Sequence, residues 1–187
     1  MKKKNKINMK LKIKVKVLVE GCMPEINKLG DCIDLRSAVD MDIPAPQSGT
    51  LKRRTDQEGN EVGYRNVTME TYYVPLGVAM ELPKGFTAKI LSRSSTPKKV
   101  GLFIPNGIGF IDNIYKGDED EWNYVCSPMR DTSIKRRDRI CQFEIGLSQH
   151  ASIWQKLKWL LSSGIKLVEV DNLGEEQRGG LGSTGLR

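Results

Sequence analysis

The chain has 187 residues, of which 39% are hydrophobic and 28% are charged, and this balance is typical of one soluble globular domain. The composition excludes a disordered chain, and no apolar run approaches the roughly 20 residues of a membrane span. The lysines at the start run into an alternating pattern and not into an apolar block. We therefore expect no signal peptide and a cytoplasmic protein.

The formal charge of +7 is concentrated at one end of the chain. The first 16 residues carry eight lysines and no acidic residue. Without them, 22 basic residues (30 − 8) and 23 acidic residues remain, so the body has a charge near −1. We interpret residues 1–9 as a basic N-terminal extension, and we expect neither membrane binding nor specific nucleic-acid binding.

The metal-binding side chains are few and badly spaced for zinc. The four cysteines form no C-x-x-C pair, and the chain has a single histidine, His150. We therefore expect no zinc site, and we interpret the cysteines as reduced residues of a cytosolic core.

In chain order, the first predicted element is a strand over residues 10–19. Leu11, Ile13, Val15 and Val17 alternate there with lysines, which is the period of a strand with one buried face. Further strand-like runs follow between turn signals, at residues 72–82, 87–91, 100–104, 108–111, 122–127, 139–145 and 166–170. Many short strands with frequent turns predict an all-β fold, a jelly roll or distorted barrel.

Two segments depart from this pattern. Residues 47–66 are polar and carry three glycines, which predicts a long surface hairpin or loop. Residues 152–163 have apolar residues at helical spacing, Ser152 as an N-cap and Gly164 as a stop, which predicts one short helix. We interpret Trp154 and Trp159 in this helix as packing residues and not as ligands.

Three runs carry polar groups that suit nucleotide chemistry. Residues 106–118 place Asp112 at the end of a strand, three residues before Tyr115, with Gly107 and Gly109 allowing close approach to the backbone. Residues 92–95, Ser-Arg-Ser-Ser, combine hydroxyls, amides and a guanidinium that suit phosphate oxygens. Residues 178–185 hold four glycines, two hydroxyls and an arginine, but no P-loop lysine. Each run alone is more often a plain turn or tail.

Five motifs that occur in a fixed order favour a functional interpretation of these runs over plain turns or tails. They are Asp34-Leu-Arg-Ser-Ala38, Arg93-Ser-Ser95, Asn106 to Asp118, Arg139-Ile-Cys-Gln-Phe143 and Arg178 to Gly185. Together they resemble the motifs of the homotrimeric dUTPase family, and in particular the dUTPases of Bacillus prophages. The resemblance covers the chain from about Leu11 to Gly185. It implies a jelly-roll trimer that hydrolyses dUTP to dUMP and pyrophosphate with Mg²⁺, at active sites between subunits.

The resemblance also implies roles for single residues. Asp112 would activate the water that attacks the α-phosphate, and Arg178 would clamp the γ-phosphate from a C-terminal arm. Asp34 would contact Mg²⁺ through water. Tyr115 would pack on the deoxyribose and exclude a ribose. The other implied substrate contacts are Arg93, Ser94, Ser95, Asn106, Gly109, Ile111, Gln142, Gly182, Ser183 and Thr184.

The same resemblance divides the chain and marks departures. Residues 10–177 would form the β domain and residues 178–187 the mobile arm. Segments 47–66 and 152–163 would be insertions, and a protein partner that binds to them stays an open alternative. Leu181 stands where many relatives carry an aromatic residue over the uracil. Two other readings stay open: a dCTP deaminase of the same fold, and a nucleotide-gated regulatory protein.

Overall fold

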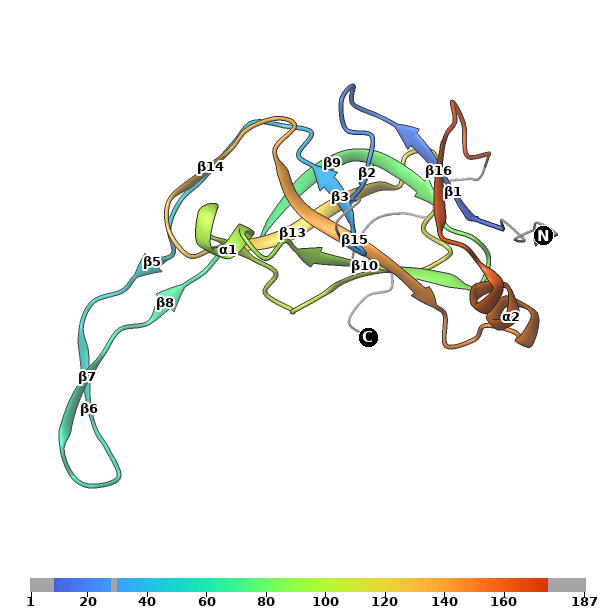
Figure 1. Ribbon diagram of the computed structural model, residues 1–187. Coiled ribbons are helices and arrows are strands. Elements are labelled where there is room, and N and C mark those ends of the chain that lie inside the picture. The colour runs from blue at the N-terminus through green and yellow to red at the C-terminus, as the bar shows by residue number, and fades with distance from the viewer. Residues whose placement is uncertain (1–8, 28–29, 175–187) are drawn as a thin grey trace, which may run out of the picture.

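The computed structural model describes residues 9–27 and 30–174, and they fold into two five-stranded sheets around one core (Figure 1). The first sheet has the order β11 (Leu102–Phe103), β13 (Glu121–Pro128), β9 (Tyr72–Glu81), β1 (Leu11–Val17) and β16 (Ile165–Glu169). The second has the order β12 (Gly109–Ile111), β10 (Phe86–Ser92), β15 (Arg139–Leu147), β3 (Ile33–Arg36) and β2 (Glu25–Ile26). The predicted all-β fold is confirmed.

The first strand shows how the alternating sequence builds the core. Leu11, Ile13 and Val15 are fully buried, while the lysines between them are exposed. β1 pairs antiparallel with β9 on one side and parallel with β16 on the other. The two sheets meet through side chains such as Trp122 and Phe143, whose rings pack edge to face with centroids 5.2 Å apart.

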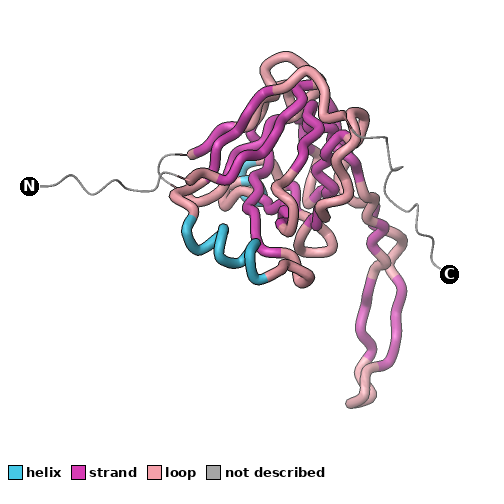
Figure 2. Tube along the Cα trace, turned by 90° about the vertical axis from the view of Figure 1, so that its right-hand side faces the viewer, coloured by secondary structure: helices cyan, strands magenta, loops and turns pink. Residues whose placement is uncertain are grey.

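A long hairpin projects from this body in both views (Figures 1 and 2). Its base is the pair β5 (Gln47–Ser48) and β8 (Val67–Thr68), and its outer part is β6 (Lys52–Thr55) and β7 (Glu61–Tyr64). Asp56 forms the tip, where one carboxylate oxygen accepts hydrogen bonds from the backbone N–H groups of Glu58 and Asn60, both at 2.9 Å. Nearly every side chain of the hairpin is exposed, so it adds nothing to the core.

The predicted inserted helix is α2 (Ile153–Leu161), and a capping box between Ser152 and Gln155 begins it. Its end differs from the prediction, because Ser162 is already extended and Gly164 lies two residues further on. Trp159 packs against Phe86 with ring centroids 5.5 Å apart, as a packing residue should. Trp154 does not pack, because 76% of its surface is exposed.

Several elements were missed or shortened by sequence reasoning. A second helix, α1 (Thr96–Lys99), has Ser95 as its N-cap, a proline in its first turn and Val100 as its C-cap. Its C-cap is the first residue of the predicted strand 100–104, and only β11 forms within that range. The strand expected at 108–111 begins at Gly109. The short strands β2 and β3 and the pair β4 (Met41–Ile43) and β14 (Thr132–Ile134) carry too few residues for a clear period.

Two further features of the described residues concern membrane crossing and the cysteines. Neither helix in residues 9–27 and 30–174 is long and apolar enough to cross a membrane. All four cysteines are free, with Cys22, Cys126 and Cys141 buried in the core and Cys32 half-buried.

Candidate active site

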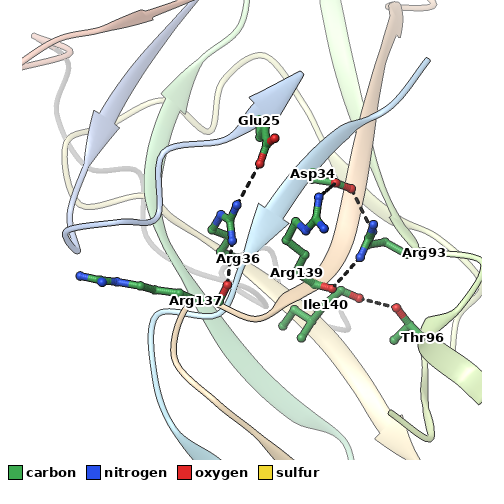
Figure 3. Close-up of polar contacts among 8 residues, drawn as sticks. All are labelled: Glu25, Asp34, Arg36, Arg93, Thr96, Arg137, Arg139 and Ile140. Carbon is green, nitrogen blue, oxygen red and sulfur yellow. Dashed lines mark hydrogen bonds and ion pairs between the residues drawn. The ribbon is translucent and has the colours of Figure 1, made fainter. Parts of the chain in front are cut away.

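A buried carboxylate organises one end of the second sheet (Figure 3). Asp34 is 2% exposed. Its Oδ1 lies 3.0 Å from Nε of Arg93, and its Oδ2 lies 3.3 Å from Nη1 of Arg139. Arg93 also donates a hydrogen bond to the backbone oxygen of Arg139, at 3.2 Å. The two guanidinium groups are thus held side by side on one carboxylate, with part of each still open to solvent.

The strand register explains why these residues meet. Gln142 of β15 stands opposite Asp34 of β3 and, on its other side, opposite Leu91 of β10. β10 ends one residue later, so Arg93 leaves the strand beside the same part of β15. Three motifs that are far apart in the sequence therefore lie on three neighbouring strands. This arrangement collects hydrogen-bond donors suited to phosphate oxygens.

The serines after Arg93 are fixed by the turn that follows. Thr96 is buried, and its hydroxyl donates a hydrogen bond to the backbone oxygen of Ile140, at 2.8 Å. Ser95 occupies the N-cap position of α1 without a side-chain capping bond, and Ser94 is exposed. Ser94 is therefore on the surface and Ser95 is half-buried, both directly after Arg93 in the chain.

Asp112 lies at the end of β12, in a separate and well-fastened turn. Its Oδ1 accepts a hydrogen bond from the backbone N–H of Ile114, at 3.2 Å, and the side chain is exposed. The amide of Asn113 donates to the backbone oxygens of Leu82 and Pro83, at 3.1 and 3.0 Å. Sequence reasoning gave Asn113 no role, yet it fastens the loop that carries the expected base.

Tyr115 is the second fixed group of this turn. Its hydroxyl donates a hydrogen bond to the backbone oxygen of Glu121, at 2.9 Å, and its ring packs partly against the core. Burial raises the pKa of the Tyr115 hydroxyl, so the ring stays neutral at physiological pH. Tyr115 as a whole is half-buried.

The backbone of β12 lies at the edge of its sheet. β12 pairs only with β10 among the described strands, so the N–H and C=O groups on its outer edge have no strand partner there. Phe110 and Ile108 point outward and are 61% and 44% exposed. Gly109 is packed so closely that a Cβ would lie 3.2 Å from Cβ of Ile90. Asn106 stands exposed in the turn before this strand.

The register also separates the expected site into two parts. Ile111, just before Asp112, stands opposite Ala88 in β10, whereas Arg93 lies five residues beyond Ala88. Five strand residues span about 17 Å, so Asp112 and Arg93 lie at opposite ends of β10. We call them the base half-site (Asn106 to Tyr115) and the phosphate half-site (Asp34, Arg93 to Ser95, Gln142). One chain does not bring the two half-sites together.

Two other expectations concern a metal ion and the arm. The described residues contain no group of three or more His, Cys, Asp or Glu side chains that could cage a metal. Asp34 is the acidic residue of the phosphate half-site, and both its oxygens contact arginines. Arg178, Leu181, Gly182, Ser183 and Thr184 lie outside the described residues.

Arg139 is the functional candidate that sequence reasoning missed. It was part of a quoted motif, but its pairing with Asp34 depends on the β3–β15 register. No signal in the sequence gives that register, because the two residues lie 105 positions apart.

Comparisons with known proteins agree with this architecture. A dUTPase from Streptococcus mutans matches with a TM-score of 0.54 at 20% identity, covering 71% of this chain and 91% of that one. A dUTPase from phage phi11 of S. aureus, described for its structural Mg(II) ion, matches with a TM-score of 0.55 at 18% identity, covering 75% and 94%. The chain therefore has the dUTPase fold.

The sequence comparisons go further. Residues 64–156 match the dUTPase family model. The SPbeta prophage-derived deoxyuridine 5'-triphosphate nucleotidohydrolase YosS of Bacillus subtilis (strain 168) is 41% identical over 164 residues, covering 87% of this chain and 90% of the relative. The deoxyuridine 5'-triphosphate nucleotidohydrolase of Orientia tsutsugamushi (strain Boryong) is 34% identical over 120 residues, covering 63% and 71%. The chain belongs to the dUTPase family.

Proposed function

We propose that the protein hydrolyses dUTP to dUMP and pyrophosphate, with Asp112 as the general base and the arginine pair on Asp34 as the phosphate-binding group. The dUTPase activity follows from the family, to which a prophage relative with 41% identity ties the chain. The observation that supports the residue roles is the register of the second sheet, which gathers Asp34, Arg93 and Gln142 on neighbouring strands.

The chemical step needs a base beside a water molecule. The exposed carboxylate of Asp112 would accept a proton from water as the water oxygen forms a bond to the α-phosphorus. The bond between the α-phosphorus and the oxygen that bridges to the β-phosphorus then breaks, and pyrophosphate leaves. Hydrogen bonds of Asn113 and Ile114 hold the turn that carries this carboxylate. Less conformational entropy is therefore lost when the carboxylate is oriented for the reaction.

Uracil would be read by the backbone of β12 and by Asn106. β12 has an edge without a strand partner among the described strands. The backbone N–H and C=O groups of Gly109 and Ile111 would serve there as fixed donors and acceptors for the base. Uracil offers an N3–H donor between two carbonyl acceptors, whereas cytosine offers an acceptor at that position. A site built for the first pattern leaves polar groups unpaired with the second, which can discriminate by about 10⁴-fold. The fixed ring of Tyr115 would leave no room for a ribose 2′-hydroxyl.

The triphosphate would bind to the phosphate half-site. Arg93 and Gln142 would donate to phosphate oxygens, and the hydroxyls of Ser94 and Ser95 would contact the leaving pyrophosphate. In the C-terminal segment, Arg178, Gly182, Ser183 and Thr184 would add contacts to the β- and γ-phosphates. These groups act mainly by neutralising charge and by positioning the phosphates.

Magnesium fits this half-site as an ion carried by the substrate. With no carboxylate cage among the described residues, phosphate oxygens and water would supply the ligands, which suits an ion that dehydrates reluctantly. Asp34 would reach the ion through water, using the carboxylate lone pairs that the two arginines leave free. Bound Mg²⁺ supplies further neutralisation of the triphosphate charge.

The separation of the half-sites supports an oligomer. Because about 17 Å of β10 lies between Ala88 and Arg93, the base half-site of one chain would work with the phosphate half-site of another. We propose a homotrimer with its active sites between subunits. Mixed trimers test this arrangement. Asp112→Asn and Arg93→Gln chains should each lose most activity alone, but co-assembled in equal amounts they should restore about one site in four, since each site draws from two chains. No recovery would place each site within one chain.

The activity itself is tested by pyrophosphate release from dUTP, dCTP, UTP and dTTP with Mg²⁺. We expect release from dUTP and almost none from the other three. Ammonia release from dCTP would instead identify a deaminase of the same fold. Absence of both products in an assembled preparation would overturn the proposed function.

A further inference from the structure

The outer face of α2 is apolar, and the helix lies at the outside of the body in both views (Figures 1 and 2). Five of its large hydrophobic side chains are exposed: Ile153 at 64%, Trp154 at 76%, Leu157 at 39%, Leu160 at 78% and Leu161 at 57%. At 3.6 residues per turn, these five positions fall within about 120° of the helix circumference. We call them the α2 apolar face.

The opposite side of α2 holds the helix to the body. The ring of Trp159 packs against Phe86, with centroids 5.5 Å apart. One turn earlier, the side chain of Gln155 lies so close to Gly85 that a Cβ on this glycine would overlap it. A surface helix normally turns its apolar stripe to the core. Here five large apolar side chains point away from the core, and a contiguous exposed patch of this kind marks an interaction surface.

Positive charge lines the α2 apolar face on both sides. Lys156 and Lys158 follow from the helical period as its two edges. Both side chains are exposed, and neither forms a salt bridge within residues 9–27 and 30–174. The sequence has no acidic residue between Glu144 and Glu169. The partner of this face should therefore carry negative charge around an apolar centre.

Further lysines lie beside the C-terminal end of α2. The N–H of Ser163 donates a hydrogen bond to the backbone oxygen of Met9, at 2.9 Å, which places the start of β1 against the end of the helix. Lys12 of β1 stands opposite Lys166 of β16, and both are exposed. Like charges directly opposite each other repel, so this pair also favours a nearby anion. Residues 1–8 add four more lysines in the sequence.

We propose that the α2 apolar face binds the surface of an anionic lipid bilayer, with its apolar side chains among the acyl chains and the lysines at the phosphate headgroups. Helices that lie in this interface carry Leu and Trp on one face and lysines beside them, which is the arrangement of α2. A protein groove could take up the apolar residues, but lysines on both edges and beside the helix end favour an extended anionic surface.

The helix is already formed before it meets the bilayer. The capping box of Ser152 and Gln155 and the contact of Trp159 with Phe86 hold it in the folded chain, so binding need not order it. Sequence reasoning expected no membrane binding, because it considered long apolar runs, and a short helix with one apolar face has none. The inference does not depend on the proposed dUTP chemistry.

The first test is co-sedimentation of the full chain with lipid vesicles. We expect binding to vesicles of equal parts phosphatidylglycerol and phosphatidylcholine, and little binding to phosphatidylcholine alone, because the lysines contribute only at a charged surface. Leu160→Ser and Trp154→Ser should each weaken binding about tenfold, since each removes an apolar side chain that enters the bilayer. The matched control is Leu51→Ser, which removes a leucine that is 58% exposed on the projecting hairpin and should leave binding unchanged.

The second test separates insertion of α2 from adhesion through lysines alone. Brominated acyl chains quench tryptophans that enter the bilayer, so the fluorescence of the wild type should fall on such vesicles, and that of Trp154→Phe should fall much less. Equal quenching in both proteins, or full binding by Leu160→Ser, would overturn the inference, because the lysines would then be sufficient for binding.

Sedimentation equilibrium identifies the competing occupant. If vesicles do not bind and Leu160→Ser lowers the mass of the assembly, the α2 apolar face is an interface between copies of this chain, and the proposal is refuted. Absence of vesicle binding with an unchanged mass refutes it as well. Circular dichroism checks that each variant is folded, as expected for substitutions of exposed side chains. Pyrophosphate release should be the same for the wild type and Leu160→Ser, so failure of the proposed function is scored separately.

Discussion

Gln142 stands directly opposite Asp34 in the antiparallel pair of β15 and β3, so two motifs separated by more than a hundred residues share one register position. On its other side, Gln142 faces Leu91, two residues before Arg93. β15 is thus the central strand of the phosphate half-site. Substitutions that shift its register should break the contacts among Asp34, Arg93 and Arg139 together. A slip of one residue turns every side chain of a strand to the other face of the sheet.

The first prediction concerns the base. Asp112→Asn should leave dUTP binding within about twofold and lower kcat by a factor of about 10² to 10⁴, because only proton acceptance is removed. The amide oxygen can still accept from the N–H of Ile114, so the turn should persist. Binding and single-turnover rates of the purified variant check this. A normal single-turnover rate would remove Asp112 from the chemical step.

The second prediction concerns the buried carboxylate. Asp34→Ala should lower the free energy of unfolding by about 2–4 kcal/mol, because Arg93 and Arg139 lose a shared partner in a buried position. Denaturant titration measures the change. The matched control is Arg53→Ala, which breaks an ion pair whose side chains are 68% and 64% exposed and should change stability by less than about 0.5 kcal/mol. Equal effects of both variants would contradict the buried role of Asp34.

The third prediction separates the two tryptophans of α2. Trp159→Ala should cost about 2 kcal/mol, because its ring packs against Phe86. Trp154→Ala should cost less than about 0.5 kcal/mol, because 76% of its surface is already exposed. Thermal unfolding of both variants measures this difference. The reverse order would mean that Trp154 is covered in the assembled protein.

The fourth prediction concerns alkaline pH. Burial raises the pKa of Cys126 from 9.0 to about 12. Between these two pH values the folded protein keeps the thiol proton, whereas the unfolded chain loses it. Stability from this thiol is present below about pH 9 and is lost as the pH rises toward 12, by about 4 kcal/mol at most. Burial raises the pKa of Tyr124 and Cys141 as well, and both add to the same trend. Denaturation between pH 8 and pH 11 should show this fall, with a smaller slope for Cys126→Ala.

The fold could be predicted from the sequence wherever a strand-like apolar run was long. β1 buries alternating residues, β9 and β10 bury nearly continuous runs, and the predicted bounds of β1, β9, β10, β13 and β15 agree within one or two positions. α2 was found because its spacing and its Ser152 cap are local signals. α1 was missed because Ser-Thr-Pro reads as a turn, and β2, β3, β4 and β14 were missed because two to four residues give no period.

The sequence supplied candidate site residues but not their arrangement. Motif resemblance named Asp34, Arg93, Asp112, Tyr115 and Gln142 as candidates, and the strand register brings three of them, Asp34, Arg93 and Gln142, together. It could not indicate that Arg139 shares the carboxylate of Asp34, or that Asn113 fastens the turn of Asp112. Those contacts depend on strand register and on loops packing across the sheet, which no single stretch of sequence encodes.

The distance along β10 implies that folding of one chain and assembly of the proposed site between chains would depend differently on protein concentration. The hydrophobic core, with Trp122 against Phe143, is built from one chain, so we expect folding of the body to be first order in protein. If the half-sites come from different chains, formation of a working site is of higher order in protein. Specific activity would then fall on dilution below the dissociation constant of the assembly, while the circular-dichroism spectrum stayed that of the folded chain.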